Sequence, residues 1–219
     1  MGFNFSKFNT PEWKEKQRKE EEERERKEAL RKQTCCIVGV GPDKLGGYGF
    51  SHPEVTKLSS VLYEVLEYEI KDGITRFMTG GDLGTSQIAF LVVESLKQKY
   101  PGLKNILVLP FGQFGETWPT EQTMLLNRIG SIADEVIEVE DLAKYEVGTV
   151  APNAPSLEKL KQREEFYADH CASVIGAYPI QDRGYDSASG ILYKGRGMGM
   201  RHVWIHTDHN FSYDARWQS

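Results

Sequence analysis

The hydrophobic positions of this chain follow two alternating patterns from residue 34 onward. Short runs of mostly apolar residues predict β-strands, which we place at 35–40, 74–80, 105–111, 134–140, 172–179 and 202–206. Longer stretches with apolar residues at helical spacing predict helices between the strands, at 52–73, 85–102, 119–133 and 156–171. Apolar residues occupy both faces of the strands, as in a parallel sheet that helices cover on both sides. We therefore predict a Rossmann-like, doubly wound α/β fold with a mainly parallel sheet.

Residues 11–33 break this pattern because nearly all of them are Glu, Lys or Arg. Glutamates repeatedly precede basic residues by four positions, and this order stabilises a helix. Thr10 and Pro11 suit the N-cap and the first helical position. We expect a charged helical arm over residues 1–33 and a single α/β domain over 34–219. The arm is either a solvated helix without a packed face or a contact for a partner or another subunit.

Composition narrows the class of protein. The chain of 219 residues is long enough for one sizeable core, and its formal net charge is −5. A mildly acidic chain is no polycation, so its charge argues against nucleic acid as a partner. No apolar run approaches the ~20 residues of a membrane span, and the three cysteines lack the spacing of a disulfide framework. We expect a cytoplasmic protein with no membrane partner, no metal and no cofactor.

The loops that follow the strands are the candidates for a site, because such sheets bind ligands at the carboxyl ends of their strands. The loop after the second predicted strand contains Gly80, Gly81 and Gly84, and a helix is expected to begin at Thr85. Glycines let a ligand approach main-chain N–H groups, and the helix start adds the positive end of its dipole. These features suit a phosphate, with Asp82 as a helix cap or as an acceptor for ribose hydroxyls. The same glycines also fit a tight structural turn, and both interpretations stay open.

A second candidate loop lies between the last two predicted strands. It is long, glycine-rich and basic, and its Arg196 is suited to neutralise a phosphate through charge-assisted contacts. Loops of this length within a compact domain are usually functional when they are ordered. We expect the loop either to contact a ligand or, alternatively, to be mobile or to contact another subunit.

Four motifs follow the predicted strands in a characteristic order. They are Gly39-Val40-Gly41-Pro42-Asp43-Lys44-Leu45, Thr79-Gly80-Gly81-Asp82-Leu83-Gly84-Thr85-Ser86, Pro110-Phe111 with Trp118, and Arg163 on the helix before the fifth strand. Together they resemble the SLOG superfamily, which includes the DNA-processing protein DprA/Smf and the LOG phosphoribohydrolases, and within it the YpsA-like branch. The resemblance spans residues 34–206. Val40 and Gly41 stand where that branch has His and Arg, and Ser86 stands where it has Asp.

The resemblance implies a nucleotide-binding protein from a bacterium or a phage that forms a homodimer or a higher homo-oligomer. We expect it to sense or sequester a nucleotide or a nucleotide-derived ligand such as ADP-ribose. The loops and the resemblance together indicate these ligand-binding residues: Gly39, Gly41, Lys44, Gly80, Gly81, Asp82, Gly84, Thr85, Phe111, Arg163 and Arg196.

Other functions remain as alternatives. LOG-like enzymes hydrolyse the N-glycosidic bond of a nucleoside monophosphate, which requires a carboxylate near the ribose. Glu116 and Glu164 are the candidates for that carboxylate, and each also fits a solvated surface acid. Nucleic-acid binding like that of DprA/Smf is the second alternative, against which the net charge argues. A scaffold with a vestigial pocket and the charged helix as an interaction arm is the third.

Overall fold

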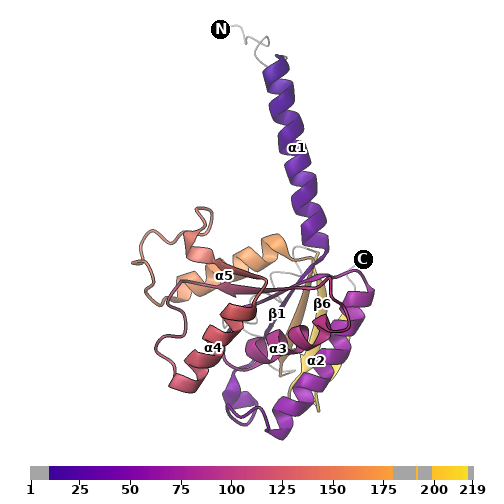
Figure 1. The fold of residues 1–219 in the computed structure, drawn as a ribbon, viewed down its shortest axis with the longest axis vertical. Coiled ribbons are helices and arrows are strands. Elements are labelled where there is room, and N and C mark those ends of the chain that lie inside the picture. The colour runs from indigo at the N-terminus through magenta and orange to yellow at the C-terminus, as the bar shows by residue number, and fades with distance from the viewer. Residues whose placement is uncertain (1–9, 180–190, 192–198, 217–219) are drawn as a thin grey trace.

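Seven strands form one sheet in the order β4-β3-β2-β1-β5-β6-β7 in the computed structural model, which describes residues 10–179, 191 and 199–216 (Figure 1). The strands are β1 (Thr34–Gly39), β2 (Arg76–Thr79), β3 (Lys104–Leu109), β4 (Glu135–Glu138), β5 (Ser173–Tyr178), β6 (Arg201–His206) and β7 (Ser212–Arg216). Every neighbouring pair is parallel except β6 and β7, which are antiparallel. The predicted Rossmann-like fold with a mainly parallel sheet is confirmed.

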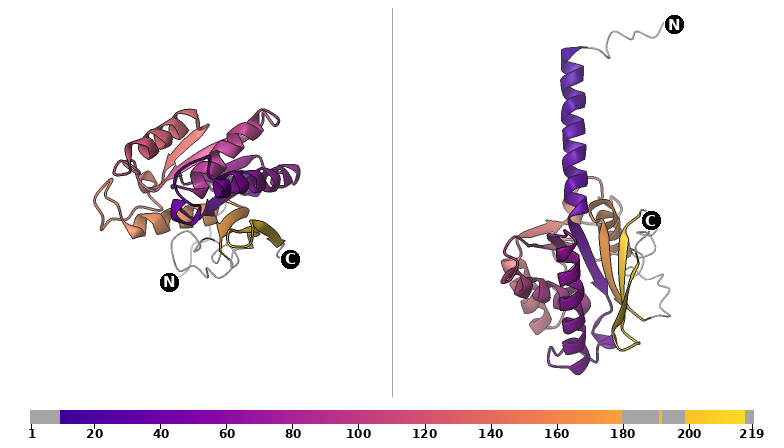
Figure 2. Two further views of the ribbon diagram at one scale, coloured as in Figure 1. Left: turned by 90° about the horizontal axis from the view of Figure 1, so that it is seen from below. Right: turned by 90° about the vertical axis from the view of Figure 1, so that its right-hand side faces the viewer.

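Helices cover both faces of this sheet (Figure 2). The covering helices are α2 (Pro53–Lys71), α3 (Thr85–Lys97), α4 (Thr120–Ile132) and α5 (Leu157–His170). The chain also forms α1 (Pro11–Lys32), which extends away from the sheet, and the short 3-10 helices η2 (Pro42–Lys44) and η3 (Val139–Asp141). Helices α2, α3 and α4 pack side by side on one face, and α5 lies on the other. This arrangement explains the near-continuous apolar runs, because a strand between two helical layers is buried on both sides. All six positions of β5 are buried, for example.

β7 is the one strand that the hydrophobic pattern did not predict. Its side chains at Ser212, Tyr213 and Asp214 are exposed. It forms the edge of the sheet, where only β6 pairs with it, and His206 Nε2 lies 3.0 Å from Asp214 Oδ2 across that pair. An edge strand with little buried surface leaves no apolar alternation in the sequence, so the tertiary pairing alone defines it.

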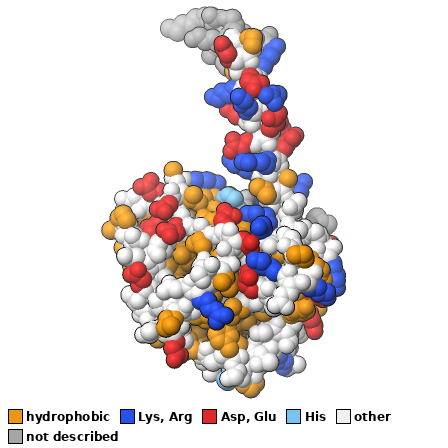
Figure 3. Space-filling model, viewed as in Figure 1, with side chains coloured by type: hydrophobic (Ala, Val, Ile, Leu, Met, Phe, Trp, Pro, Cys, Tyr) orange, Lys and Arg blue, Asp and Glu red, His pale blue; other side chains and the backbone are white. Residues whose placement is uncertain are grey.

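The charged helix α1 extends from the amino edge of the sheet, where β1 begins, and none of its residues is buried (Figure 1). Its acidic and basic side chains are interleaved around the helix (Figure 3), and they form ion pairs with neighbours three or four positions away. Thr10 caps it by accepting a hydrogen bond from the Trp13 N–H at 3.2 Å. Local charge pairs, rather than packing, therefore stabilise this helix.

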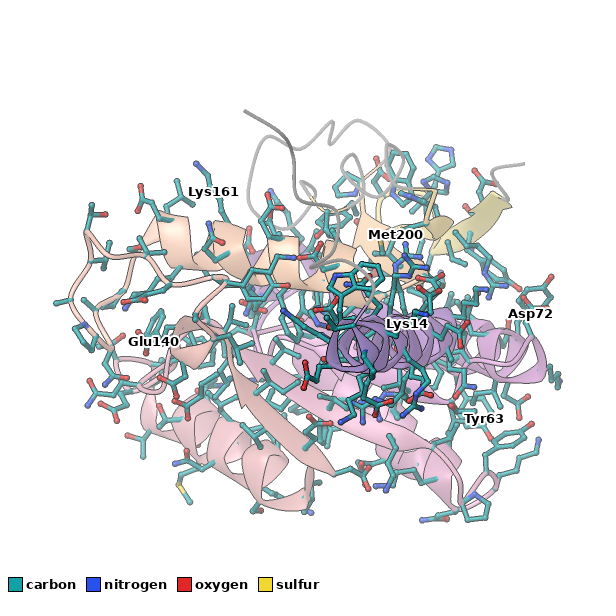
Figure 4. The ribbon with its side chains drawn as sticks, turned by 90° about the horizontal axis from the view of Figure 1, so that it is seen from above. Lys14, Tyr63, Asp72, Glu140, Lys161 and Met200 are labelled. Carbon is teal, nitrogen blue, oxygen red and sulfur yellow. The ribbon has the colours of Figure 1, made fainter. Side chains whose placement is uncertain are left out.

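A buried ion-pair network also lies at the amino edge. Glu69, near the end of α2, is fully buried and accepts a hydrogen bond from Ser173 Oγ at 2.9 Å. The Arg201 guanidinium pairs with both Glu69 and Asp72. Figure 4 looks down on this edge and labels Asp72 and Met200, the residue before Arg201. The network ties the end of α2 to the first residues of β5 and β6.

Candidate functional site

The carboxyl edge of the sheet, opposite α1, contains the topological switch point. β1 pairs with β2 on one side and with β5 on the other. The chain therefore leaves β1 in one direction and returns to its other side only after β4. Open α/β sheets bind ligands in the crevice outside the strand ends at such a point. The loops after β1 and β2 both emerge there.

The glycine loop after β2 is locked to the loop after β1. The N–H and the hydroxyl of Thr85 both donate to the carbonyl oxygen of Val40, at 3.1 and 3.0 Å. Gly84 has φ +91°, and a Cβ there would lie 2.6 Å from the same oxygen. A Cβ on Gly39 would lie 2.6 Å from the Thr85 side chain, which is fully buried. Gly39, Gly84 and Thr85 thus share one tight contact, and the Thr85 hydroxyl proton is already engaged.

Arg163 is the centre of a second group at the same edge. It projects from α5, and its Nη1 donates to the Gly80 carbonyl oxygen at 3.2 Å. Its Nη2 donates to Asp82 at 3.0 Å. A side chain on Gly80 would place its Cβ 2.5 Å from Arg163 Nη1 and 2.3 Å from Asp82 Oδ2. Because Gly80 has no side chain, the Arg163 guanidinium can reach the loop.

The Arg163–Asp82 pair is buried on the arginine side and open on the carboxylate side. The Arg163 side chain is 9% exposed, whereas the Asp82 side chain is 36% exposed. Burial alone would lower the pKa of Arg163, but the adjacent Asp82 carboxylate raises it, so the guanidinium stays charged. Arg163 therefore holds the Asp82 carboxylate in place, while part of that carboxylate remains accessible to solvent.

The loop after β3 adds aromatic side chains to this group. The Phe114 ring lies 5.6 Å from the Arg163 guanidinium carbon and packs edge-on against Trp118 at 5.0 Å. Phe111 is buried and also contacts Phe114 edge-on, at 5.5 Å. A guanidinium on an aromatic face is a favourable contact that also restricts the arginine. Of these residues, sequence reasoning proposed Phe111 for the site, and Phe114 is the one that reaches Arg163.

The same loop is held by a buried lysine that the sequence did not single out. Lys159 is 3% exposed, and its Nζ donates to Glu140 Oε2 at 2.7 Å and to the Ala151 carbonyl at 2.8 Å. Glu140 in turn accepts from the Gly112 N–H at 3.0 Å. Burial would raise the pKa of Glu140, but these donors lower it overall. Nothing local in the sequence marks this contact, because its members Lys159, Glu140, Ala151 and Gly112 come from four separate segments of the chain.

The remaining candidates lie around these two groups. Lys44 is 62% exposed on its side chain, with Nζ 3.8 Å from Asp43 Oδ2. Glu116 is exposed on the loop after β3, and Glu164 is partly exposed on α5 beside Arg163. Gly41 contributes backbone against which Gly84 packs, and Gly81 (φ +71°) packs on the side chains of α4 and β3. Arg196 lies outside the residues that the structure describes.

Within the described ranges, no three His, Cys, Asp or Glu side chains gather as a metal site would require. No described helix is long and apolar enough to cross a membrane. The candidate site consists of a glycine loop, a half-exposed aspartate that pairs with a buried arginine, and the aromatic rings of the loop after β3.

Comparison with known proteins identifies the family to which this chain belongs. The family model YpsA, described as the "YspA SLOG family", matches residues 35–187. The chain belongs to this SLOG family. The match begins in β1 and includes both loops of the switch point, Arg163 and the aromatic loop after β3.

Relatives of this SLOG protein occur in a prophage and in bacteria. The uncharacterized SPbeta prophage-derived protein YoqJ of Bacillus subtilis is 35% identical over 165 residues, which are 74% of this chain and 95% of YoqJ. A UPF0398 protein of Lactiplantibacillus plantarum is 35% identical over 143 residues, which are 64% of this chain and 69% of that protein. Neither name states a ligand or a reaction.

A solved structure with the same fold is DNA processing protein A (DprA) from Streptococcus pneumoniae. It has a TM-score of 0.50 and 14% sequence identity, and the likeness covers 84% of this chain and 54% of DprA. The SLOG chain thus spans about half of the DprA structure. At this identity the comparison shows a shared fold and no more.

Proposed function

We propose that this protein binds a nucleotide or a nucleotide-derived ligand, such as ADP-ribose, at the carboxyl edge of its sheet. The observation that carries the proposal is the half-exposed Asp82, held by the buried Arg163 at the topological switch point. Membership of the SLOG family, a group of nucleotide-related Rossmann-like proteins, supports it. The function is to sense or sequester the ligand.

Asp82 is the group proposed to contact the sugar. Its carboxylate has lone pairs that Arg163 does not use, so it can accept hydrogen bonds from two hydroxyl groups of a ribose. Acidic residues hold ribose hydroxyls in this way in dinucleotide-binding folds. Arg163 acts as a positioning residue, because its two donors fix Asp82 and the Gly80 carbonyl together.

The phosphate is proposed to lie near Gly84 and the first turn of α3, the position that an anion favours at a helix start. Gly84 brings the start of α3 against the loop after β1, and the exposed Lys44 on that neighbouring loop supplies a positive charge. Gly39, Gly41, Gly81 and Thr85 support these loops. Arg196 remains a candidate phosphate contact from the loop before β6.

The test is thermal unfolding of the purified protein against AMP, ADP-ribose, NAD and cyclic dinucleotides. A ligand at 100 times its dissociation constant stabilises a protein by about 2.7 kcal/mol, which gives a clear rise in Tm. We expect at least one member to raise the Tm of the wild type and of the surface control Glu121→Gln, but not that of Asp82→Asn. No shift with any member at millimolar concentration would overturn the proposal.

Chromatography of the same mixtures separates binding from N-glycosidic hydrolysis. Intact nucleotide after prolonged incubation supports sensing or sequestration. Release of the free base would favour the ribohydrolase alternative, with Glu116→Gln and Glu164→Gln as the variants to compare. Binding of single-stranded DNA that weakens as salt rises would favour the DprA-like alternative. Light scattering of the full chain tests the expected homodimer or higher homo-oligomer.

A further inference from the structure

A pocket lies beside the glycine loop, between the loop that follows β1 and the first turns of α2, α3 and α4. Its floor is apolar, because Leu45, Val55 and Ile88 line it and each is no more than 4% exposed. Gly84 forms part of its rim. The pocket is therefore adjacent to the position proposed for the phosphate, at the same edge of the sheet.

Two aromatic side chains stand at the mouth of this pocket. Tyr48 is 55% exposed and Phe50 is 47% exposed, and both line it. Exposed aromatic rings at a pocket mouth are a common feature of sites that stack flat ligands. Space remains beside this loop at two positions, since a Cβ at Gly47 or at Gly49 would have nothing within 4 Å.

The lining of the pocket is uncharged. Besides apolar and aromatic groups it presents the amides of Gln87 and Gln122, and no charged side chain among the described residues contributes to it. Gln87 Nε2 donates to the Gly81 carbonyl oxygen at 3.2 Å, which fixes that amide and leaves its oxygen as an acceptor. A phosphate would find no counter-charge here, whereas a neutral aromatic heterocycle would find a stacking surface and hydrogen-bonding edges.

We propose that this pocket takes the base of the nucleotide, stacked on Tyr48 or Phe50 and read at its edge by Gln87 and Gln122. The inference rests on the proposed function, since it assigns one part of the same ligand. It divides the ligand between two surfaces: Asp82 holds the sugar, and the uncharged pocket holds the base.

The loop must move for the base to enter. The cavity volume of the pocket is about 30 Å³, which is room for only a few water molecules, since ~10–15 Å³ by this measure holds one. Gly46 and Gly47, with φ of +79° and +126°, give the loop a backbone that other residues rarely adopt. Binding of a base therefore requires the aromatic segment over residues 46–50 to move outward.

The experiment compares dissociation constants for AMP and ADP-ribose, measured by calorimetry on the full chain. The test variant is Tyr48→Ala/Phe50→Ala, and the matched control is Tyr63→Ala/Tyr68→Ala, which removes two exposed tyrosines of α2 that do not line the pocket. Loss of a stacking ring should weaken binding about 5- to 150-fold in the test variant and leave the control at the wild-type value. Phe50→Trp, which retains a ring, should bind as the wild type does.

The outcomes separate this inference from the function on which it rests. Weaker binding in the test variant alone supports the base site. Wild-type affinity in Tyr48→Ala/Phe50→Ala, together with lost affinity in Asp82→Asn, would overturn the base site and leave nucleotide binding in place. Failure of the wild type to bind any nucleotide would overturn both. Both test residues are half-exposed, so circular dichroism should show the fold unchanged; if the double variant does not fold, Phe50→Ala against Phe50→Trp makes the same comparison.

Discussion

Arg201 and Arg163 hold carboxylates at opposite edges of one sheet, and the two surroundings differ. At the amino edge Glu69 is fully buried, and Ser173 and Arg201 surround it. At the carboxyl edge 36% of the Asp82 side chain is exposed, although Arg163 beneath it is as buried as Arg201. The closed Arg201–Glu69 pair joins elements together and offers no group to a ligand, and the second carboxylate on Arg201, Asp72, is 42% exposed but lies at the amino edge. An open pair keeps a charged, oriented oxygen at the edge where such sheets bind ligands.

The largest expected effect is a difference in the free energy of unfolding between variants of the two pairs. Glu69→Gln should lower the free energy of unfolding by about 3 kcal/mol, because it removes the fully buried counter-charge of Arg201 and leaves that guanidinium only the half-exposed Asp72. Asp82→Asn should cost about 1 kcal/mol or less, since its half-exposed pair is screened by solvent. Urea unfolding at neutral pH measures both. Equal losses in the two variants would contradict the distinction between a closed and an open pair.

The second prediction concerns ligand binding at the open pair. Gly80→Ala places a Cβ where Arg163 Nη1 and Asp82 Oδ2 now lie, at 2.5 and 2.3 Å, so the pair must separate. Affinity for the nucleotide should fall about tenfold or more, as expected when a charge-assisted contact is lost. Gly102→Ala is the matched control, because its Cβ would meet nothing within 4 Å. Unchanged affinity in Gly80→Ala, measured by calorimetry, would show that the pair does not position the ligand.

A smaller effect is expected at Glu138, an acid of the carboxyl edge with no cationic partner among the described residues. Burial, and then the charges of Asp141 and Glu140, raise the pKa of Glu138. The folded protein therefore holds this proton more tightly than the unfolded chain does, and stability is lost as pH rises through the folded pKa. Glu138→Gln should stabilise the protein at neutral pH by up to about 0.5 kcal/mol. The gain should vanish below about pH 4, where the carboxyl is protonated in both states.

Urea unfolding at the two pH values measures this difference, with the exposed Glu121→Gln as control. A stabilisation that persists at low pH would mean that shape or hydrogen bonding, rather than charge, is responsible.

The smallest expected effect is at the arm. Removal of residues 1–27 should leave nucleotide affinity unchanged, because α1 extends from the amino edge and the site lies at the other. The described part of α1 has no buried residue, so the Tm of the rest should also change little, while the helical signal in circular dichroism falls. Calorimetry and circular dichroism test both points. A loss of affinity would indicate that the arm acts on the site, either directly or through assembly of subunits.

The glycine loop shows how much of the structure can be predicted from the local sequence pattern. Gly80, Gly81 and Gly84 are recognisable from the sequence as a turn before a helix, and the turn is there. The sequence does not show why each of these positions is a glycine, because the reason is a neighbour from another element. That neighbour is Arg163 of α5 for Gly80, Leu126 of α4 for Gly81, and Val40 after β1 for Gly84. Thr85 also depends on a distant neighbour, since its hydroxyl donates to the Val40 carbonyl oxygen 45 positions away.

By itself, the sequence determined the alternation of strands and helices, the mainly parallel sheet, the charged helix and the edge at which a site should lie. These follow from hydrophobic spacing, charge spacing and glycine position, which are properties of neighbouring residues. Only the tertiary structure decided which side chains meet there: Asp82 with Arg163, Phe114 over that arginine, Lys159 with Glu140, and β7 along β6. These contacts join segments far apart in the chain, and the packing of helices on a twisted sheet, rather than any local preference, brings them together.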